Sequence, residues 1–350
     1  MPLSRRSALT ALAGLSITAA TLASPRNSAQ AMESGAGALA QWRARTPMPQ
    51  GRAEVGAAVL DGRLYVVGGT LQRDDTAPVW ASDVVTSYDP STGRWSSHTP
   101  LPRPLTHVGV ASLDGRLYAF GGFTDAVHLH PQPVAYAYHP ARDLWSRLPD
   151  MPRKLGSVAV AAVDGRLHLI GGRESTTVVT IPEPPISLGF GTVNSHFVYD
   201  PRRCRWSAAP PLPGEPRDHA GIAVLGRDIH VFGGRVADVN DNLARHDVYH
   251  TGTGRWSTAA PLPAPRSAGA AVVLDGRIVY AGGECGAGGG TFGDVSFYDP
   301  ESDSWSAHSP LPRSRHGFGA GAVRGRAYFA GGAPACGGGA SKDTLELRLR

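Results

Sequence analysis

Several signatures of enzymes and nucleic-acid-binding proteins are missing from this sequence of 350 residues. It has no Gly-x-Ser-x-Gly motif and no carboxylate pair at an informative spacing, so a hydrolase site is not predicted. The glycine-rich segment 286–290 precedes an expected strand, so it lacks the helix N-terminus on which a phosphate loop depends. No basic run is interleaved with aromatic residues, and nucleic acid is therefore not an expected partner. No motif predicts a bound cofactor or metal ion.

Long apolar runs are also scarce. The run Ala8–Ala23 is short and rich in Ala and Thr, so an integral membrane protein is not predicted. It follows Arg5-Arg6 and precedes Ala29–Ala31, which is the layout of a signal peptide over residues 1–31. The two arginines resemble a twin-arginine signal, but the large apolar residue that usually follows is absent, so the general secretory route stays open. We expect export to the periplasm or the cell exterior after cleavage.

The basic composition partly reflects this segment. Removing residues 1–31 takes away three arginines and no acidic residue, which lowers the formal charge from +5 to +2. The high isoelectric point is therefore no argument for an acidic partner such as nucleic acid.

A long repeat organises the rest of the chain. Six glycine pairs recur at intervals of 53, 50, 62, 49 and 49 residues. A tryptophan precedes each pair by 26 residues, or by 27 in the fourth copy, and a proline follows each tryptophan by seven. The pairs begin at Gly68, Gly121, Gly171, Gly233, Gly282 and Gly331, and the tryptophans are Trp42, Trp95, Trp145, Trp206, Trp256 and Trp305. A fixed long period indicates a repeat array.

Each copy reads as four short strands. Two apolar runs are joined by a tight turn, Asp61-Gly62-Arg63 in the first copy, because glycine accepts the positive φ of a hairpin. The runs are apolar at nearly every position, as strands covered on both faces must be. A third strand, Val84–Tyr88 in the first copy, and a fourth that carries the tryptophan complete the unit. Six such units without helical periodicity predict an all-β propeller.

This pattern resembles the Kelch repeat. The resemblance rests on the Asp-Gly-Arg turn, the strand Leu64–Gly69, the Tyr88–Pro90 turn and the tryptophan, and it covers residues 42–350 in six copies. It implies one six-bladed Kelch-type β-propeller over residues 32–350.

The ends of the chain predict how the ring closes. After Gly332 the chain offers one strand, Thr344–Arg350, and no tryptophan, whereas a spare tryptophan strand, Leu39–Arg45, precedes the first hairpin. We expect the N-terminal strand to become the outer strand of the last blade, because this pairing removes an exposed edge.

Cysteine is rare, with three residues in the chain. Cys285 and Cys336 lie three and five residues after the first glycine of their pairs, so both begin the same loop in neighbouring blades. After export they can form a disulfide if their Cα atoms lie within about 7 Å; two unrelated thiols are the alternative. Cys204 lies in a turn on the opposite face and is expected to be free.

Loop lengths distinguish the two faces of the expected disc. The interval from glycine pair to next tryptophan is 27, 24, 35, 23 and 23 residues, so the variation falls after the glycine pairs, where we expect binding. Trp80 in the first such loop can stack on a sugar or a partner side chain, or merely cover its blade. The other candidates in these loops are Asp74, Asp75, His128, His130, Arg173, Glu174 and the segment 175–196.

The first strand of each blade is expected to line a central channel. A ring of mixed polarity stands fourteen residues before the glycine pairs, and consists of Glu54, His107, Ser157, His219, Ala268 and Gly317. Two residues further on, every copy has Gly or Ala, as crowding near the axis requires. Two residues before the ring stand Arg52, Arg217, Arg266 and Arg315. These arginines can grip an acidic ligand, or they can brace the loops between blades.

Three functions remain open. The first is a binding module, expected to be a monomer, that takes a protein or glycan on its loop face and channel mouth. The second rests on similarity to exported sialic acid mutarotases, which implies a sugar epimerase with an Arg–Glu pair at the mouth. Its candidates are Glu54, Glu174, Glu284, Arg173, Arg217 and Arg235. The third and most remote resembles galactose oxidase and implies copper near His107, His219 and His316, although that family has seven blades.

Overall fold

The computed structural model describes residues 41–72, 79–125, 128–174, 191–238, 241–286 and 289–349. All of them belong to one compact unit, residues 38–350. The expected signal peptide, Asp74, Asp75 and most of the long third-blade loop lie outside the described residues.

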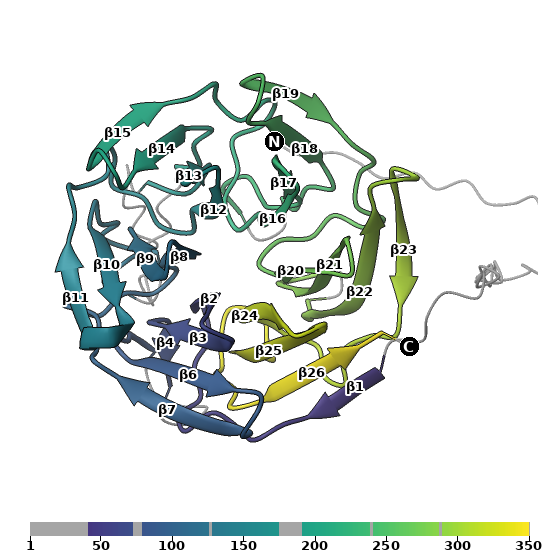
Figure 1. Ribbon diagram of the computed structural model, residues 1–350. Helices are drawn as coiled ribbons and strands as arrows, with labels where there is room; N and C mark the ends of the chain where they lie inside the picture. Colours follow the sequence, from purple (N-terminus) through teal and green to yellow (C-terminus); the bar gives the residue numbers. More distant parts are fainter. Residues whose placement is uncertain are drawn as a thin grey trace, which may run out of the picture. The chain divides into compact units, whose positions relative to one another are not determined.

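Strands of the described residues form six four-stranded antiparallel sheets around a central channel, and the inner strand of each sheet faces the axis (Figure 1). From inner to outer strand, the first three blades are β2 (Gly56–Leu60), β3 (Arg63–Val67), β6 (Val85–Asp89), β7 (Arg94–His98); β8 (Gly109–Leu113), β9 (Arg116–Phe120), β10 (Ala135–His139), β11 (Leu144–Arg147); and β12 (Ala159–Val163), β13 (Arg166–Ile170), β14 (His196–Asp200), β15 (Arg205–Ala208). The last three are β16 (Gly221–Leu225), β17 (Asp228–Phe232), β18 (His246–His250), β19 (Arg255–Thr258); β20 (Ala270–Leu274), β21 (Arg277–Gly283), β22 (Phe292–Asp299), β23 (Ser304–His308); and β24 (His316–Val323), β25 (Arg326–Ala333), β26 (Thr344–Arg348), β1 (Gln41–Ala44). The predicted six-bladed propeller is confirmed.

Ring closure also follows the prediction. Strand β1 pairs antiparallel with β26, and Trp42 stands opposite Leu347. The Trp42 ring packs 5.2 Å from that of Phe329 in the same blade. The last blade therefore contains strands from both ends of the chain, and its edge is covered by main-chain hydrogen bonds.

The hairpin turns explain the Asp-Gly-Arg signature. In the first blade the two central residues, Asp61 and Gly62, have φ of +49° and +71°, which is the pattern of a type I′ turn. The fourth blade departs from it: Leu225 pairs with Asp228, so Gly226 and Arg227 form the turn and only Gly226 has positive φ. Both solutions match the right-handed twist of the strands.

Each repeat tryptophan links neighbouring blades. Its indole N–H donates to a carbonyl of the preceding segment, as in Trp95 to Thr46 at 2.9 Å and Trp145 to Thr99 at 3.0 Å. The other four bonds join Trp42 to Ser309, Trp206 to Pro149, Trp256 to Pro210 and Trp305 to Ala260. A carbonyl acceptor at the same place in each preceding blade accounts for the constant position of the tryptophan in the repeat.

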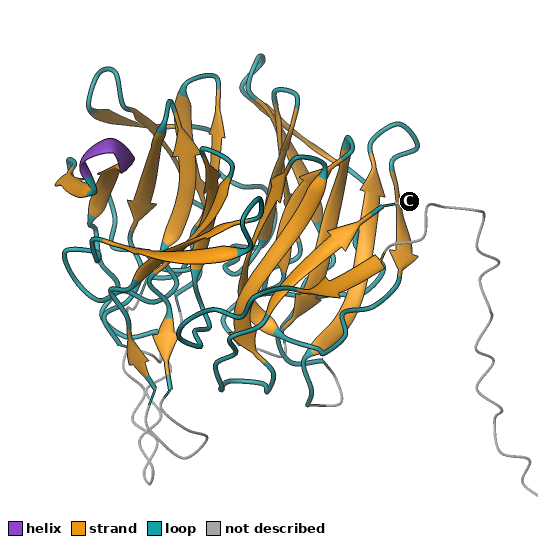
Figure 2. Ribbon diagram, turned by 60° about the horizontal axis from the view of Figure 1, so that its bottom comes forward, coloured by secondary structure: helices purple, strands orange, loops and turns teal. Residues whose placement is uncertain are grey.

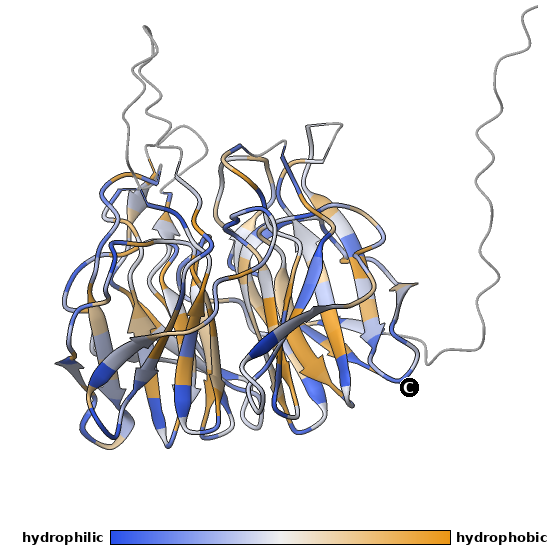
Figure 3. Cartoon of the chain, turned by 90° about the horizontal axis from the view of Figure 1, so that it is seen from above, coloured by the Kyte–Doolittle hydropathy of each residue, from blue (hydrophilic) through white to orange (hydrophobic). Residues whose placement is uncertain are grey.

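The inner strands are as crowded as predicted. A Cβ added at Gly56 would lie 2.3 Å from Cγ2 of Val110 in the next blade, and one at Gly319 would lie 2.5 Å from Cβ of Ala57. Buried apolar side chains also fill the space between blades, for example Val67 and Val85 against Leu117. Figure 3 shows hydrophobic residues along the strands and hydrophilic residues at many of the turns.

Loops gather at both ends of the strands (Figure 2). One end carries the hairpin turns and the short 3₁₀ helix η1 (Pro140–Arg142). The other end carries the glycine pairs, the loops that follow them and the two-residue strands β4 (Thr70–Leu71) and β5 (Trp80–Ala81). We call this second end the glycine-pair face.

Candidate functional site

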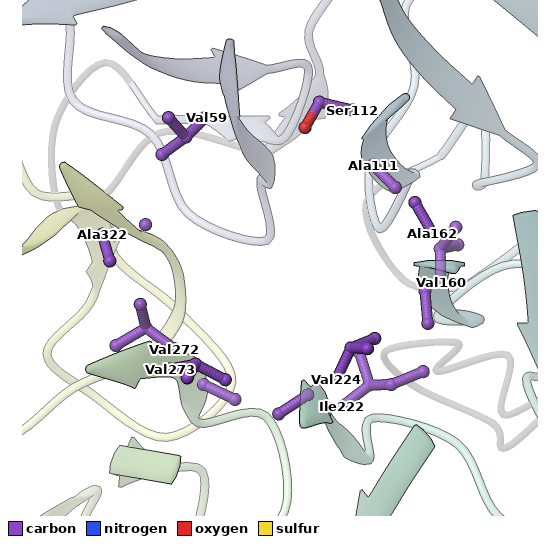
Figure 4. A pocket seen from close by; sticks show the side chains of 14 residues that line it. Val59, Ala111, Ser112, Val160, Ala162, Ile222, Val224, Val272, Val273 and Ala322 are labelled. Carbon is purple, nitrogen blue, oxygen red and sulfur yellow. The ribbon is translucent and has the colours of Figure 1, made fainter. Parts of the chain in front are cut away.

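Two cavities of different chemistry lie on the channel axis. The larger, of about 340 Å³, is lined mainly by small apolar side chains of the inner strands, including Val59, Ala111 and Val272 (Figure 4). The smaller, of about 140 Å³, is lined by the predicted ring that contains Glu54, His107 and His219. We call it the mouth cavity. Only the mouth cavity offers titratable side chains among its lining residues.

The ring around the mouth cavity has an unusual backbone. All six residues have positive φ, from +50° at Glu54 and His219 to +61° at Gly317. Five of them are not glycine, and such conformations cost energy that the surroundings must offset. Hydrogen bonds between successive blades do so: His107 N–H donates to Glu54 O at 3.0 Å, and Ser157 N–H donates to His107 O at 3.0 Å.

Each blade carries polar residues onto this ring by extending its first two strands past the glycine pair. Asp218 thereby bridges Arg235, Gly156 bridges Arg173, and His316 pairs with Ala333. In the fifth blade Glu284 N–H donates to Ser267 O at 2.9 Å. The residue fifteen positions before a glycine pair therefore meets the residue that follows the pair. Asp218 was missed by the sequence analysis, although this constant spacing was available to find it.

Glu54 lies between two imidazoles. Its Oε2 is 3.0 Å from Nε2 of His107, and its Oε1 is 3.0 Å from Nε2 of His316. Burial alone would raise the pKa of Glu54, but the charges and hydrogen bonds of the two histidines hold it well below its usual value. Burial lowers the pKa of His316, yet Glu54 and Glu284 outweigh that effect and raise it. Proton exchange between these groups is therefore possible at short range.

A network of buried ion pairs lies next to Glu54, His107 and His316. Asp218 accepts from Arg173 and from His219 Nδ1, the latter at 2.6 Å, and Arg235 binds Glu284. Burial would raise the pKa of Asp218, but His219 and the two arginines lower it. Burial and then Arg235 lower the pKa of His219 to about 4, so this imidazole is neutral near pH 7.

The imidazole of His128 lies beside those of His107 and His219. Its Nε2 lies 3.1 Å from Nε2 of His107, and its ring centroid lies 5.2 Å from that of His219. Burial, followed by the charges of His107 and His219, lowers the pKa of His128 well below its usual value. The sequence predicted His128 as a loop residue, and its place beside the channel is a result of the structure.

The four arginines two residues before the ring, Arg52, Arg217, Arg266 and Arg315, do not face the mouth cavity. Arg52 donates through Nη1 to Gly68 O at 2.9 Å and to Val84 O at 2.6 Å. Arg266 and Arg315 likewise reach the carbonyls of Gly282 and Gly331, while Arg217 binds Val231 O and Asp247. All four are buried. Their guanidinium groups point into the blades and bind carbonyl oxygens there. This geometry supports a structural bracing role and does not place the four groups where they could bind an acidic ligand.

Other candidates are dispersed. Glu174 is partly exposed and pairs with Arg153 at 2.9 Å, outside the network. Trp80 on β5 is 41% exposed. Cys285 and Cys336 are joined by a disulfide with Cα atoms 5.2 Å apart, and Cys204 is free and exposed.

The fold and this polar mouth define a β-propeller with one chemically distinct end. Residues 151–332 match the KLHDC2/KLHL20/DRC7 Kelch-repeats domain, and residues 51–102 and 104–152 each match a Kelch motif. The chain therefore belongs to the Kelch-repeat family, whose propellers are typical protein-interaction modules.

Relatives match over part of their length. Kelch-like protein terF of Aspergillus terreus is 30% identical over 53% of this chain and 39% of its own. Beta-scruin of Limulus polyphemus is 37% identical over 24% of this chain and 9% of its own, and Kelch-like ECH-associated protein 1A of Danio rerio is 39% identical over 21% and 12%. The chain thus spans well under half of these relatives.

A solved structure supports the fold. The structure of YjhT aligns with a TM-score of 0.71 over 87% of this chain and 97% of its own, at 16% identity. At that identity the likeness shows the fold alone. Among the described residues no helix has the length and apolar character needed to cross a membrane.

Proposed function

We propose that this protein is an exported binding propeller that takes a protein or glycan ligand on its glycine-pair face. One observation carries the proposal: the titratable mouth cavity and the loops of variable length lie on the same face. A rigid frame with variable loops at one end is a common arrangement for binding.

Trp80 gives this face an aromatic contact point. It is one of two large hydrophobic side chains that are exposed in the described part of the chain; the other is Leu144, 49% exposed. Leu144 begins β11, two residues after the end of η1, and therefore lies at the hairpin-turn end. Aromatic side chains stack well on sugars and partner residues, and exposed ones are frequent anchors of binding surfaces.

The two residues provide a matched test. Residues 32–350 would be screened on a glycan array, and each hit would be titrated by calorimetry against W80A and L144A. We expect W80A to weaken binding at least tenfold and L144A to leave it unchanged. Equal effects of the two substitutions, or no saturable ligand at all, would contradict the proposal for glycans.

A second candidate is a sugar epimerase, as the resemblance to sialic acid mutarotases implied. The Glu54 carboxylate between two imidazoles supports it, since such a group can accept and return a proton. Anomeric exchange of N-acetylneuraminate would be followed by NMR with the wild type and E54Q. Catalysis lost in E54Q supports this function, and a wild-type rate equal to the uncatalysed rate rejects it. Arg217 is not a suitable partner variant because it is turned into its blade.

A further inference from the structure

Three histidines from different parts of the chain converge at the mouth cavity. His107 and His219 stand on the inner ring in the second and fourth blades, and His128 follows the glycine pair of the second blade. One ligand nitrogen from each lies within 4.8 Å of the other two. His107 and His219 are buried, and His128 is partly buried, so the three imidazoles meet largely away from solvent.

The separation of these nitrogens suits one metal ion. Imidazole nitrogens bound about 2.0–2.1 Å from a tetrahedral zinc lie about 3.3 Å apart. The Nε2 atoms of His107 and His128 lie 3.1 Å apart. The ring centroids of His107 and His219 are separated by 5.0 Å. With all three ligand nitrogens within 4.8 Å of one another, the imidazoles lie within reach of a common ion.

The Nδ1 atoms of His219 and His107 already have hydrogen-bond partners. Nδ1 of His219 donates to Asp218 at 2.6 Å, which leaves the lone pair of the ring on Nε2. Nδ1 of His107 lies 2.9 Å from Oγ1 of Thr106, which can accept the second ring proton. Metal-binding histidines usually donate their second N–H to a carboxylate or another oxygen in this way, because that bond fixes the tautomer and the ring plane.

The surrounding charge permits a divalent cation. Three carboxylates, of Glu54, Asp218 and Glu284, face two guanidinium groups, of Arg173 and Arg235, and the His316 imidazole in the network. Arg235 Nη2 and Ser157 Oγ each lie 3.3 Å from His219 Nε2, and Glu54 Oε2 lies 3.0 Å from His107 Nε2, so an ion bound by these nitrogens would replace the three contacts. Arg235 would keep Glu284 and Asp218 as partners.

We propose that His107, His128 and His219 bind one late first-row divalent transition ion, of the zinc type, through their Nε2 atoms. Nitrogen donors select such ions over Mg²⁺ and Ca²⁺, which prefer oxygen. Three protein ligands leave one tetrahedral position for a further ligand, and the Glu54 carboxylate, 3.0 Å from His107 Nε2, lines the same cavity as His107 and His219. This site is independent of the binding role proposed for the glycine-pair face.

The neighbouring histidine of the same loop supplies a control. His130 is exposed and pairs with Asp125 at 2.5 Å, away from the three imidazoles. Residues 32–350, prepared without a polyhistidine tag and stripped with a chelator, would be titrated calorimetrically with Zn²⁺ and with Mg²⁺. We expect one Zn²⁺ per chain, no Mg²⁺ binding, at least a tenfold weaker Zn²⁺ affinity in H128Q, and no change in H130Q.

X-ray absorption at the zinc edge of the loaded wild type gives a second, variant-free readout, and we expect the scattering of three imidazoles. This measurement decides the question if H128Q has a lower melting temperature than H130Q. Absence of stoichiometric Zn²⁺ binding, equal loss in both variants, or a spectrum without imidazole scattering would overturn the proposal.

Discussion

Two pairs of buried histidines predict that the propeller loses stability in mild acid. In the third blade Nδ1 of His168 lies 2.9 Å from Nε2 of His196, and in the fourth blade Nδ1 of His230 lies 2.9 Å from Nε2 of His246. Nδ1 of His246 donates to Ala260 O at 3.0 Å, so in the neutral ring Nε2 of His246 accepts the hydrogen bond from Nδ1–H of His230. In the third blade Nδ1 of His196 likewise donates to Pro210 O, so each bond between rings is lost when the accepting ring, His246 or His196, gains a second proton.

The pKa shifts give the size and sign of the effect. Burial lowers the pKa of His168, His230 and His246 to about 4 and that of His196 to about 3, whereas the unfolded value is 6.5. The unfolded chain therefore binds more protons between about pH 6.5 and pH 4, and stability falls as the pH drops through this window. At pH 5 one such group costs about 2 kcal/mol, at about 1.4 kcal/mol per pH unit below 6.5. The four groups together therefore cost about 8 kcal/mol at pH 5, against a usual total stability of about 5–15 kcal/mol.

The double variant H230N/H246Q tests this reasoning. Asn and Gln place an amide near the nitrogens that the two rings use, but they do not titrate. Urea unfolding would be measured at pH 7.5, 6 and 5 for the wild type, the double variant and H130N, which changes an exposed histidine. Between pH 7.5 and 5 the double variant should lose about 4 kcal/mol less than the wild type, because two titrating groups are removed, while H130N should follow the wild type. Parallel curves for the double variant and the wild type would refute the argument.

Three further substitutions test what holds the ring together. W42F keeps the packing on Phe329 but removes the N–H bond to Ser309 O, so calorimetry should show about 1 kcal/mol less stability and a slightly lower melting temperature. R52K cannot serve all the acceptors that Arg52 reaches in the first blade, so urea unfolding should show a loss of about 1–3 kcal/mol; an unchanged midpoint would contradict the bracing role. C285S opens a bond that joins two blades and should cost about 2–4 kcal/mol under oxidising conditions, whereas C204S should cost nothing measurable.

The repeat is the part of this protein that its sequence determines by itself. Constant spacing of tryptophan and glycine pair reflects contacts that recur in each blade, such as the indole bond from Trp95 to Thr46. The unpaired strand around Trp42 and the missing one after Gly332 were enough to predict how the ring closes. These features follow from short-range rules, because each blade repeats the same turns and the same neighbour contacts.

The polar mouth was decided by tertiary structure. The repeat relates Asp218 to Arg235 within one blade, but Glu284 comes from the next blade and His128 from a loop, so no spacing along the chain brings these four together. The tertiary structure also decided the role of Arg52. A guanidinium two residues before the ring can point into the mouth cavity or into the blade, and that of Arg52 points into the blade. Which side chains meet at the axis depends on the packing of six blades around it, since that packing sets the left-handed turns and the distances between residues far apart in the chain.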